Sequence, residues 1–275
     1  MIVVTGATGN VGRRLVETLA AEGEEVTAVS RRITAADVPD GVRTVQADLA
    51  RADGLKEVFD GADRVFLLTS GEFLAAGGDV AEVVAAAKDA GVGRIVLLSS
   101  QGVGSGRHAS AYEEAVKASS PEWTVLRPGG FASNAFQWAP AVQADRVVAA
   151  PFGDVALPVI DPADIADVAA AVLRGSGHHG RTYVLTGPEP ISPRRQAADL
   201  ADALGEPVRF AELSEAEARA AMSEFMPPVV VEATLAILGE PTEDEQRVSP
   251  DVERVLGRPG RTFAEWAARN AAAFK

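Results

Sequence analysis

Three glycines near the start of the chain are spaced so that they could bind a phosphate group. Gly6, Gly9 and Gly12 recur at three-residue spacing, between the apolar run 2–4 and a segment with apolar residues at helical spacing. A glycine turn between a strand and a helix brings backbone N–H groups close to an anion, at the positive end of the helix dipole. The GxxGxxG spacing differs from GxGxxG, and a purely structural glycine turn is the alternative. The strand–turn–helix context favours the pyrophosphate site of a dinucleotide.

The residues after the second expected strand indicate which dinucleotide is bound. The strand 25–30 ends at Ser30 and is followed by Arg31 and Arg32 rather than by Asp or Glu. A carboxylate there would bind the ribose hydroxyls and repel a 2′-phosphate, whereas guanidinium groups pair with phosphate. Arg13 could assist from the first helix, and solvated surface arginines are the alternative. We therefore expect a preference for NADP(H) over NAD(H).

These side chains need a framework of strands and helices that brings them together. Apolar strand-like runs alternate with amphipathic helical segments, which is typical of a parallel sheet covered on both faces. The expected strands are 2–4, 25–30, 43–46, 64–68, 94–98 and 123–126, with late candidates at 155–160 and 183–185. The expected helices between them are 52–60, 77–90, 108–119 and 130–144. Ligands of doubly wound sheets bind beyond the carboxyl ends of the strands.

The predicted fold class is α/β, a Rossmann-type doubly wound parallel sheet with a small, mostly helical C-terminal lobe. The strand–helix rhythm weakens late in the chain, so we expect an NAD(P)-binding domain over 1–150. A substrate lobe is expected over 151–275, with some of its segments returning to the sheet. Later helix starts are marked by Asp161-Pro162, by Ser192-Pro193, and by capping boxes at Ser214 with Glu217 and at Thr262 with Glu265.

The composition excludes several kinds of site and partner. The 275 residues include no cysteine and 3 histidines, so disulfides and thiolate metal sites are excluded and no metal site is expected. The formal net charge of −13 disfavours nucleic-acid backbones and anionic membranes. No uncharged apolar stretch reaches membrane-spanning length, and no basic region or cleavage site precedes the first strand. We expect a cytoplasmic protein that binds neither nucleic acid nor membrane.

Motifs distributed along the chain occur in a familiar combination. They are TGATGNVG at 5–12, the serine pair at 99–100, WTVLRPGGFASN at 123–134, DPADIADVAAAVL at 161–173 and GHHGRTYVLTG at 177–187. Together they resemble the NmrA-like family of atypical short-chain dehydrogenases, over almost the whole chain except its least distinctive C-terminal part. That family includes quinone reductases of the type 2 NAD(P)H:quinone oxidoreductase kind, related small-molecule reductases, and redox-sensing regulators without turnover.

The resemblance implies how the chain would hold its cofactor. Residues 5–11 would wrap the diphosphate, Arg31 would hold the 2′-phosphate, and residues 68–70 would line the path toward the nicotinamide. From its position after a strand, Asp48 could contact the adenine or cap a helix. Small polar loops at strand ends are places where backbone approaches a ligand, with ordinary turns as the alternative. The expected cofactor contacts are Thr5, Gly6, Thr8, Gly9, Asn10, Val11, Gly12, Arg31, Arg32, Asp48, Leu68, Thr69, Ser70, Ser99, Pro128, Gly129 and Phe131.

The expected helix 108–119 departs from the pattern of ordinary short-chain dehydrogenases. Those enzymes place Tyr and Lys four residues apart, so that one helical face carries the proton donor and the cation that lowers its pKa. Here Tyr112 and Lys117 are five residues apart and face different directions. Many members of the resembled family carry His and Glu at four-residue spacing here, where this chain has Ala109 and Glu113.

Three residues remain candidates for proton transfer: Tyr112, His108 and Ser100. His108 and Tyr112 would share one face of the expected helix and could form a pair. An exposed histidine at a helix start is the alternative.

Without a fixed proton donor, hydride transfer to a conjugated or quinonoid acceptor stays feasible because the acceptor delocalises the negative charge. Candidate substrate contacts are Gln101, Asn134, Phe136, Trp138 and Phe225, with core packing as the alternative for the aromatic residues. We favour an NADPH-dependent reductase of a small aromatic or quinonoid compound, and a homodimer is a candidate assembly. A non-catalytic NADP(H)-sensing regulator acting through protein contacts is the second hypothesis. Sugar-nucleotide epimerisation ranks below both, because it normally needs the Tyr–Lys pair.

Overall fold

The computed structural model describes residues 1–51, 54–69, 73, 76–119 and 122–275. The chain forms two compact units. Unit 1 comprises Met1–Pro128, Pro162–Leu185 and Asp251–Gly257, and unit 2 comprises Gly129–Asp161, Thr186–Pro250 and Arg258–Lys275. The expected boundary at residue 150 therefore differs from this division, because unit 2 begins earlier and later segments return to unit 1.

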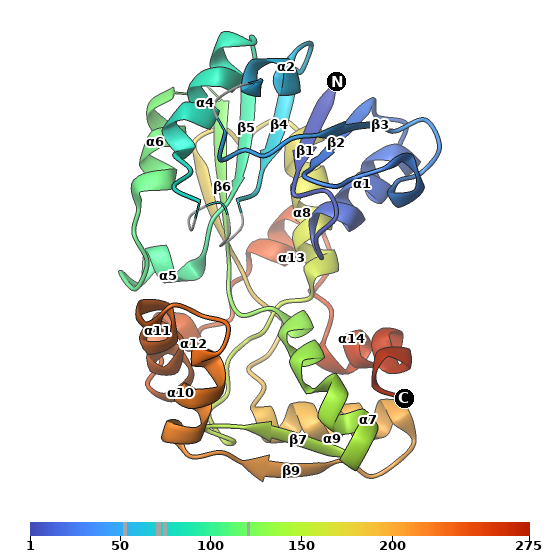
Figure 1. Cartoon of the computed structure of the whole chain (residues 1–275), viewed down its shortest axis with the longest axis vertical. Coiled ribbons are helices and arrows are strands. Elements are labelled where there is room, and N and C mark those ends of the chain that lie inside the picture. The colour runs from blue at the N-terminus through green and yellow to red at the C-terminus, as the bar shows by residue number, and fades with distance from the viewer. Residues whose placement is uncertain (52–53, 70–72, 74–75, 120–121) are drawn as a thin grey trace. The chain divides into compact units, whose positions relative to one another are not determined.

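Unit 1 is built on a parallel sheet, with seven strands over the described residues in the order β3-β2-β1-β4-β5-β6-β8 (Figure 1). All six neighbouring pairs in it are parallel. The strands are β1 Ile2–Thr5, β2 Val26–Ser30, β3 Arg43–Gln46, β4 Arg64–Leu67, β5 Arg94–Leu98, β6 Glu122–Pro128 and β8 Arg181–Leu185. The order reverses between β1 and β4, as in a doubly wound sheet. The predicted fold class is confirmed.

Helices cover both faces of this sheet, which explains why its strands are apolar on both sides. The longer ones are α1 Gly12–Ala21, α2 Leu55–Phe59, α4 Val80–Asp89, α6 Ala111–Ser119, α8 Pro162–Arg174 and α13 Asp251–Leu256. On one face α4 contacts α2 and α6, and on the other α8 contacts α1 and α13 (Figure 1). Val80, Val83 and Val84 recur at helical spacing and pack on buried strand residues such as Val65 and Ile95. Two short elements complete the unit: the 3₁₀ turn η1 Ala35–Asp37 and α5 Gln101–Gly104.

Unit 2 is mostly helical around its own core. Its elements are η2 Ala132–Trp138, α7 Ala139–Asp145, β7 Val147–Ala150, α9 Pro193–Leu204, β9 Arg209–Glu212, α10 Glu215–Ser223, α11 Pro228–Gly239, α12 Glu243–Gln246, α14 Phe263–Asn270 and η3 Ala271–Phe274. Strands β7 and β9 pair in parallel. Trp138, Trp266 and Phe274 are buried in the core of this unit.

One strand and one helix start predicted from the sequence were wrong. The segment 155–160 is not a strand: it makes only isolated bridges, from Leu157 to Ile191 and from Ile160 to Phe131. Pro158 lies between these bridges and has no N–H to continue a ladder. The helix expected over 108–119 begins at Ala111.

The helix caps read from the sequence are confirmed. Ser192 accepts from the N–H of Arg195 at the start of α9. The capping boxes at Ser214 with Glu217 and at Thr262 with Glu265 begin α10 and α14. Each satisfies backbone N–H groups that a helix start leaves without partners.

Candidate cofactor and active site

The glycines of the first turn are required by close backbone packing. Gly6 has φ +63°, and a Cβ atom built there would lie 2.7 Å from Leu68 Cδ2. A Cβ atom on Gly12 would lie 2.2 Å from the carbonyl oxygen of Gly6. The N–H of Gly9 donates to that same carbonyl at 3.0 Å, which closes the turn. No side chain other than hydrogen fits at Gly12, so α1 begins directly against the end of β1.

Thr5 links the two strands between which the sheet order reverses. Its hydroxyl donates toward the carbonyl oxygens of Phe66 and Leu68, at 3.2 and 3.0 Å, and accepts from the N–H of Leu68 at 2.8 Å. The residue is fully buried. Its side chain therefore shapes the floor of the site, and a contact of Thr5 with the diphosphate stays a prediction.

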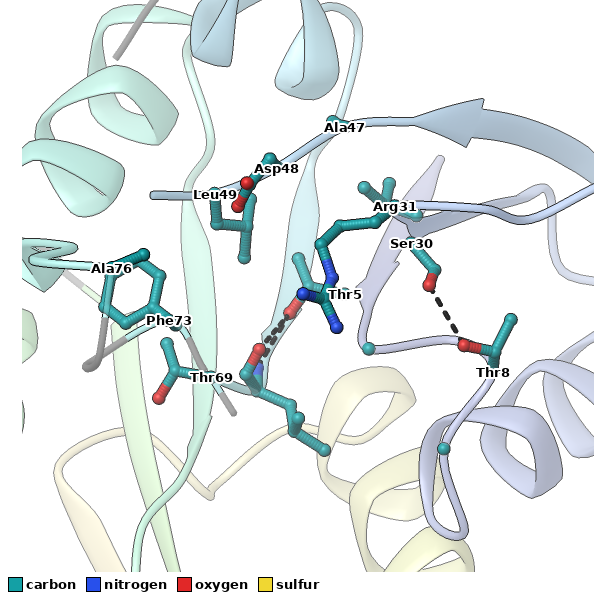
Figure 2. A pocket seen from close by; sticks show the side chains of 14 residues that line it. Thr5, Thr8, Ser30, Arg31, Ala47, Asp48, Leu49, Thr69, Phe73 and Ala76 are labelled. Carbon is teal, nitrogen blue, oxygen red and sulfur yellow. Dashed lines mark hydrogen bonds between the residues drawn. The ribbon is translucent and has the colours of Figure 1, made fainter. Parts of the chain in front are cut away.

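A hollow of about 220 Å³ opens over this turn in unit 1. In Figure 2 the side chain of Arg31 extends from the end of β2 toward the middle of the hollow. At the start of α1, Val11 makes no side-chain cap, and the first turn carries no acidic residue. No carboxylate in the first turn of α1 therefore neutralises the positive end of the helix dipole. This leaves the helix start suited to an anionic ligand. The lining residues are Thr5, Gly6, Thr8, Gly9, Val29, Ser30, Arg31, Ala47, Asp48, Leu49, Leu68, Thr69, Phe73 and Ala76.

Asp48 is not a helix cap, and its contact with the adenine stays a prediction. Its carboxylate accepts from the N–H of Ala50 at 3.1 Å and so holds the turn after β3, although no helix starts there. It also lines the hollow, on the side where β2 and β3 end. Nearby, the hydroxyl oxygens of Thr8 and Ser30 lie 2.9 Å apart and tie the glycine turn to the end of β2.

The structure brings together eight of the seventeen expected cofactor contacts. Those that line the hollow are Thr5, Gly6, Thr8, Gly9, Arg31, Asp48, Leu68 and Thr69. Arg32 is exposed and is not among the lining residues. Gly129 and Phe131 belong to unit 2, and Pro128 is the last residue of β6, so their approach to a cofactor stays a prediction. Ser70 lies outside the described residues.

Sequence reasoning missed several lining residues. Val29 and Ser30 end β2, and Ala47 and Leu49 follow β3, so the rule that ligands bind at strand ends could have found them. No sequence pattern indicated Phe73, because it lies several residues beyond the end of β4 rather than directly after the strand.

A buried carboxylate forms a second cluster at the ends of β5 and β6. Glu113 is 1% exposed and accepts from Nε and Nη2 of Arg127, both at 2.8 Å. It also accepts from Lys117 Nζ at 2.9 Å and from the hydroxyl of Ser99 at 2.7 Å. The hydroxyl of Ser99, an expected cofactor contact, is therefore directed to Glu113.

The Glu113 cluster is ionised at neutral pH. Burial alone would raise the pKa of the Glu113 carboxyl, but the hydrogen bonds from Arg127, Lys117 and Ser99 outweigh burial and lower it to about 2. Lys117 follows Glu113 by four residues, the spacing at which ordinary short-chain dehydrogenases place Tyr and Lys. Glu113, rather than Tyr112, has this spacing from Lys117. As a permanent carboxylate it holds neighbouring groups but has no proton to donate.

The predicted pair of His108 and Tyr112 is wrong. His108 precedes α6, which starts at Ala111, so the two residues share no helical face. Within the described chain the hydroxyl of Tyr112 is buried without a hydrogen-bond partner. Burial, with a smaller contribution from Asp79, raises the pKa of that hydroxyl. The ring of Tyr112 packs edge-on against Phe73, with centroids 6.4 Å apart.

The candidate substrate residues differ in exposure. Trp138 is buried in the core of unit 2, so its expected substrate role is contradicted by its packing. Phe136 is 36% exposed and stacks on Phe274 at 5.9 Å, while Phe225 is 65% exposed. Asn134 is also exposed. Gln101 begins α5 in unit 1.

Comparison with known proteins places this site in a family. A family profile described as NAD(P)H-binding matches residues 6–175. The (4-alkanoyl-5-oxo-2,5-dihydrofuran-3-yl)methyl phosphate reductase of Streptomyces griseus is 40% identical over 283 residues, which cover 100% of this chain and 99% of that protein. The chain belongs to this NAD(P)H-binding family. The resemblance found in the sequence is thereby confirmed.

Other members of the family are similar over the full length. The NAD(P)H azoreductase of Xenophilus azovorans is 33% identical over 291 residues, which cover 100% of this chain and 99% of that protein. The structure of an NADPH-dependent quinone oxidoreductase of Escherichia coli in complex with NADPH has a TM-score of 0.81 at 28% identity, over 98% of this chain and 99% of that one. The chain is accordingly an NAD(P)H-dependent oxidoreductase.

Metal and membrane sites were also sought in the described residues. No group of three or more His, Cys, Asp or Glu side chains there could hold a metal ion. No helix in that part of the chain is both long and apolar enough to cross a membrane.

Proposed function

We propose that this chain uses NADPH to reduce a small electron-poor acceptor, either a quinone or a C=C bond conjugated to a carbonyl group. The observation that carries the cofactor half of the proposal is Arg31, which extends from the end of β2 into the hollow over the glycine turn. A guanidinium at this position pairs with a 2′-phosphate, where a carboxylate would repel it.

The residues of the hollow fit such a cofactor. The turn closed by Gly6, Gly9 and Gly12 keeps side chains away from the backbone that a diphosphate would approach. Asp48, beyond the end of β3, is on the adenosine side, and Leu68 and Thr69 continue the lining at the end of β4. When bound, the cofactor supplies a hydride, that is, one proton and two electrons, to the acceptor.

The acceptor class rests on what the relatives are named for. A 5-oxo-2,5-dihydrofuran with a 4-alkanoyl group has its ring C=C bond conjugated to two carbonyl groups. The other two relatives are named for azo compounds and quinones, which are also flat conjugated acceptors. In each case the charge that arrives with the hydride spreads over several atoms. This chemistry suits a site in which the buried carboxylate of Glu113 is ionised and has no proton to donate.

Turnover with a panel of acceptors tests the proposal. Purified protein should oxidise NADPH with simple quinones and with α,β-unsaturated lactones or ketones, at rates that saturate with acceptor concentration. Saturated ketones of the same size should react far more slowly, because they cannot delocalise the charge. Tight NADPH binding without oxidation across the whole panel would contradict the proposal and favour a non-catalytic NADP(H) sensor.

A further inference from the structure

Ser100 lies where the reactive end of a cofactor bound in this hollow would extend. Arg31 and Asp48 line the hollow at the ends of β2 and β3, where the proposed function puts the adenosine half. The other half must therefore run across β1 and β4 toward β5. Strands β4 and β5 pair with Leu67 opposite Leu97, so the residues after β5 follow beside those after β4. Ser100 is the second residue after β5 and caps α5.

Hydrogen bonds direct the hydroxyl of Ser100. Its Oγ accepts from the N–H of Gly102 at 3.1 Å and lies 3.1 Å from Nδ1 of His108. A hydroxyl has two acceptor lone pairs and one hydrogen. When Nδ1 of His108 carries a proton and donates it, both lone pairs of Ser100 are used. The hydrogen of Ser100 is then directed away from both partners and can be donated to a third group.

His108 is held in this position by the loop that follows α5. The N–H groups of Arg107 and His108 both donate to the carbonyl oxygen of Gly102, at 2.8 and 2.9 Å. The imidazole lies against Gly102 itself: a Cβ atom there would be 2.6 Å from Nδ1. The same short turn therefore holds the backbone of His108 and provides the surface against which its ring packs.

Three other groups near this strand end are held in contacts of their own or are enclosed. Glu113 is ionised, with its pKa lowered to about 2, and the hydroxyl of Ser99 is donated to it. The hydroxyl of Tyr112 is buried. Among these described groups, Ser100 with His108 behind it can both give up a proton and recover one.

We propose that Ser100 and His108 form a proton relay that completes reduction of a conjugated carbonyl acceptor. This inference rests on the proposed function. The hydride from NADPH forms a new C–H bond at the β-carbon, the C=C π bond breaks, and its electron pair moves onto the carbonyl oxygen. Ser100 gives its hydroxyl proton to that oxygen, Nδ1 of His108 gives its proton to Ser100, and Nε2 of His108 takes up a proton from water. The products are the enol, which tautomerises in water, and NADP⁺.

Two acceptors distinguish a relay from a structural role. A reduced quinone leaves as a phenolate-like anion, whose conjugate acid has a pKa of about 10, so it does not require a donor in the site. The enolate formed from an unsaturated lactone is more basic, so it requires a proton donor in the site. His108→Gln and Ser100→Ala should each lower kcat for the lactone by about 100-fold, with kcat for the quinone and Kd for NADPH changed less than about threefold. The double variant should lose no more than either single variant.

Two further variants test the geometry and the proton source. Gly102→Ala should reproduce the lactone defect, because the new methyl group displaces the His108 ring. Added imidazole should restore part of the lactone rate of His108→Ala, and His179→Gln, which alters an exposed histidine, serves as the control. Equal losses with both acceptors, or no loss with either, would overturn the relay while leaving the reductase intact. If the unmodified protein reduces neither acceptor, the proposed function itself fails.

Discussion

Lys117 donates to the carboxylate of Glu113 across one turn of α6, with 2.9 Å between Nζ and Oε2. Arg127 and Ser99 bind the same carboxylate, so a single buried side chain connects α6 with the ends of β5 and β6. This arrangement makes Glu113 a structural anchor between the helix and the two strands.

The first prediction concerns acid stability. The pKa of Glu113 is lowered from 4.5 to about 2 in the folded protein, so its ionisation stabilises the fold above pH 4.5. That contribution, about 3 kcal/mol, should be lost as the pH falls from about 4.5 to about 2. Urea unfolding across this pH range should show the loss in the unmodified protein. Glu113→Gln should lower the free energy of unfolding at pH 7 by about 3–5 kcal/mol, because Arg127 and Lys117 lose their counter-charge.

Glu82→Gln is the matched control for this experiment, because Glu82 is an exposed carboxylate on α4. It should change the free energy of unfolding by less than about 0.5 kcal/mol at any pH tested. Equal stabilities of Glu113→Gln and Glu82→Gln would show that the buried cluster is not an anchor.

The second prediction concerns cofactor preference. Arg31→Ala should weaken NADPH binding by about 1.5–3 kcal/mol, the range for a hydrogen bond to a charged group, and leave NADH binding nearly unchanged. Arg32 is exposed outside the hollow, so Arg32→Ala should have a much smaller effect. Fluorescence titration of both cofactors measures these changes. Equal dissociation constants for NADPH and NADH in the unmodified protein would contradict the assignment of Arg31.

The third prediction concerns the glycine turn. Gly12→Ala should push α1 away from β1, because its Cβ atom would lie 2.2 Å from the carbonyl oxygen of Gly6. We expect a loss of about 1–3 kcal/mol in the free energy of unfolding, the range for overpacking, together with weaker binding of NADPH and NADH alike. Gly93→Ala is the control, since its nearest neighbour is 3.8 Å away. Unchanged cofactor binding in Gly12→Ala would mean that the turn still binds the cofactor when α1 lies farther from β1.

The fourth prediction concerns Tyr112. Its hydroxyl is buried without a partner in the described chain, so Tyr112→Phe should leave the free energy of unfolding unchanged or raise it by about 1 kcal/mol. Quinone turnover should fall only modestly. Thermal melting and steady-state kinetics measure the two effects. A loss of turnover of about 1000-fold would show that the hydroxyl reaches the reacting atoms when substrate is bound.

The sequence predicted what depends on local periodicity and on strand ends. Arg31 and the glycine turn were correctly placed because strand, turn and helix follow one another directly. The pairing of His108 with Tyr112 failed because it depended on a helix boundary, and α6 begins at Ala111. Helix boundaries are hard to predict where no strong cap marks the start.

Long-range contacts were out of reach of the sequence. Nothing in the order of residues shows that Arg127, fourteen positions away, supplies two hydrogen bonds to Glu113. The four-residue spacing of Glu113 and Lys117 is visible in the sequence, but spacing alone does not show that the pair is buried and joined by Arg127. Trp138 was misjudged because an aromatic residue in the core and one in a pocket have the same local pattern.

The chain passes between its two units at 128/129, 161/162, 185/186, 250/251 and 257/258. Cutting the chain at one point therefore cannot separate the two units. The fragment 1–150, for example, would lack β8, α8 and α13 of unit 1. For the same reason, exchanging gene segments with a relative at one crossover point would divide at least one of the units, and any point between 129 and 257 would divide both. A change of acceptor in this lineage is thus more accessible through scattered point substitutions than through the shuffling of whole modules.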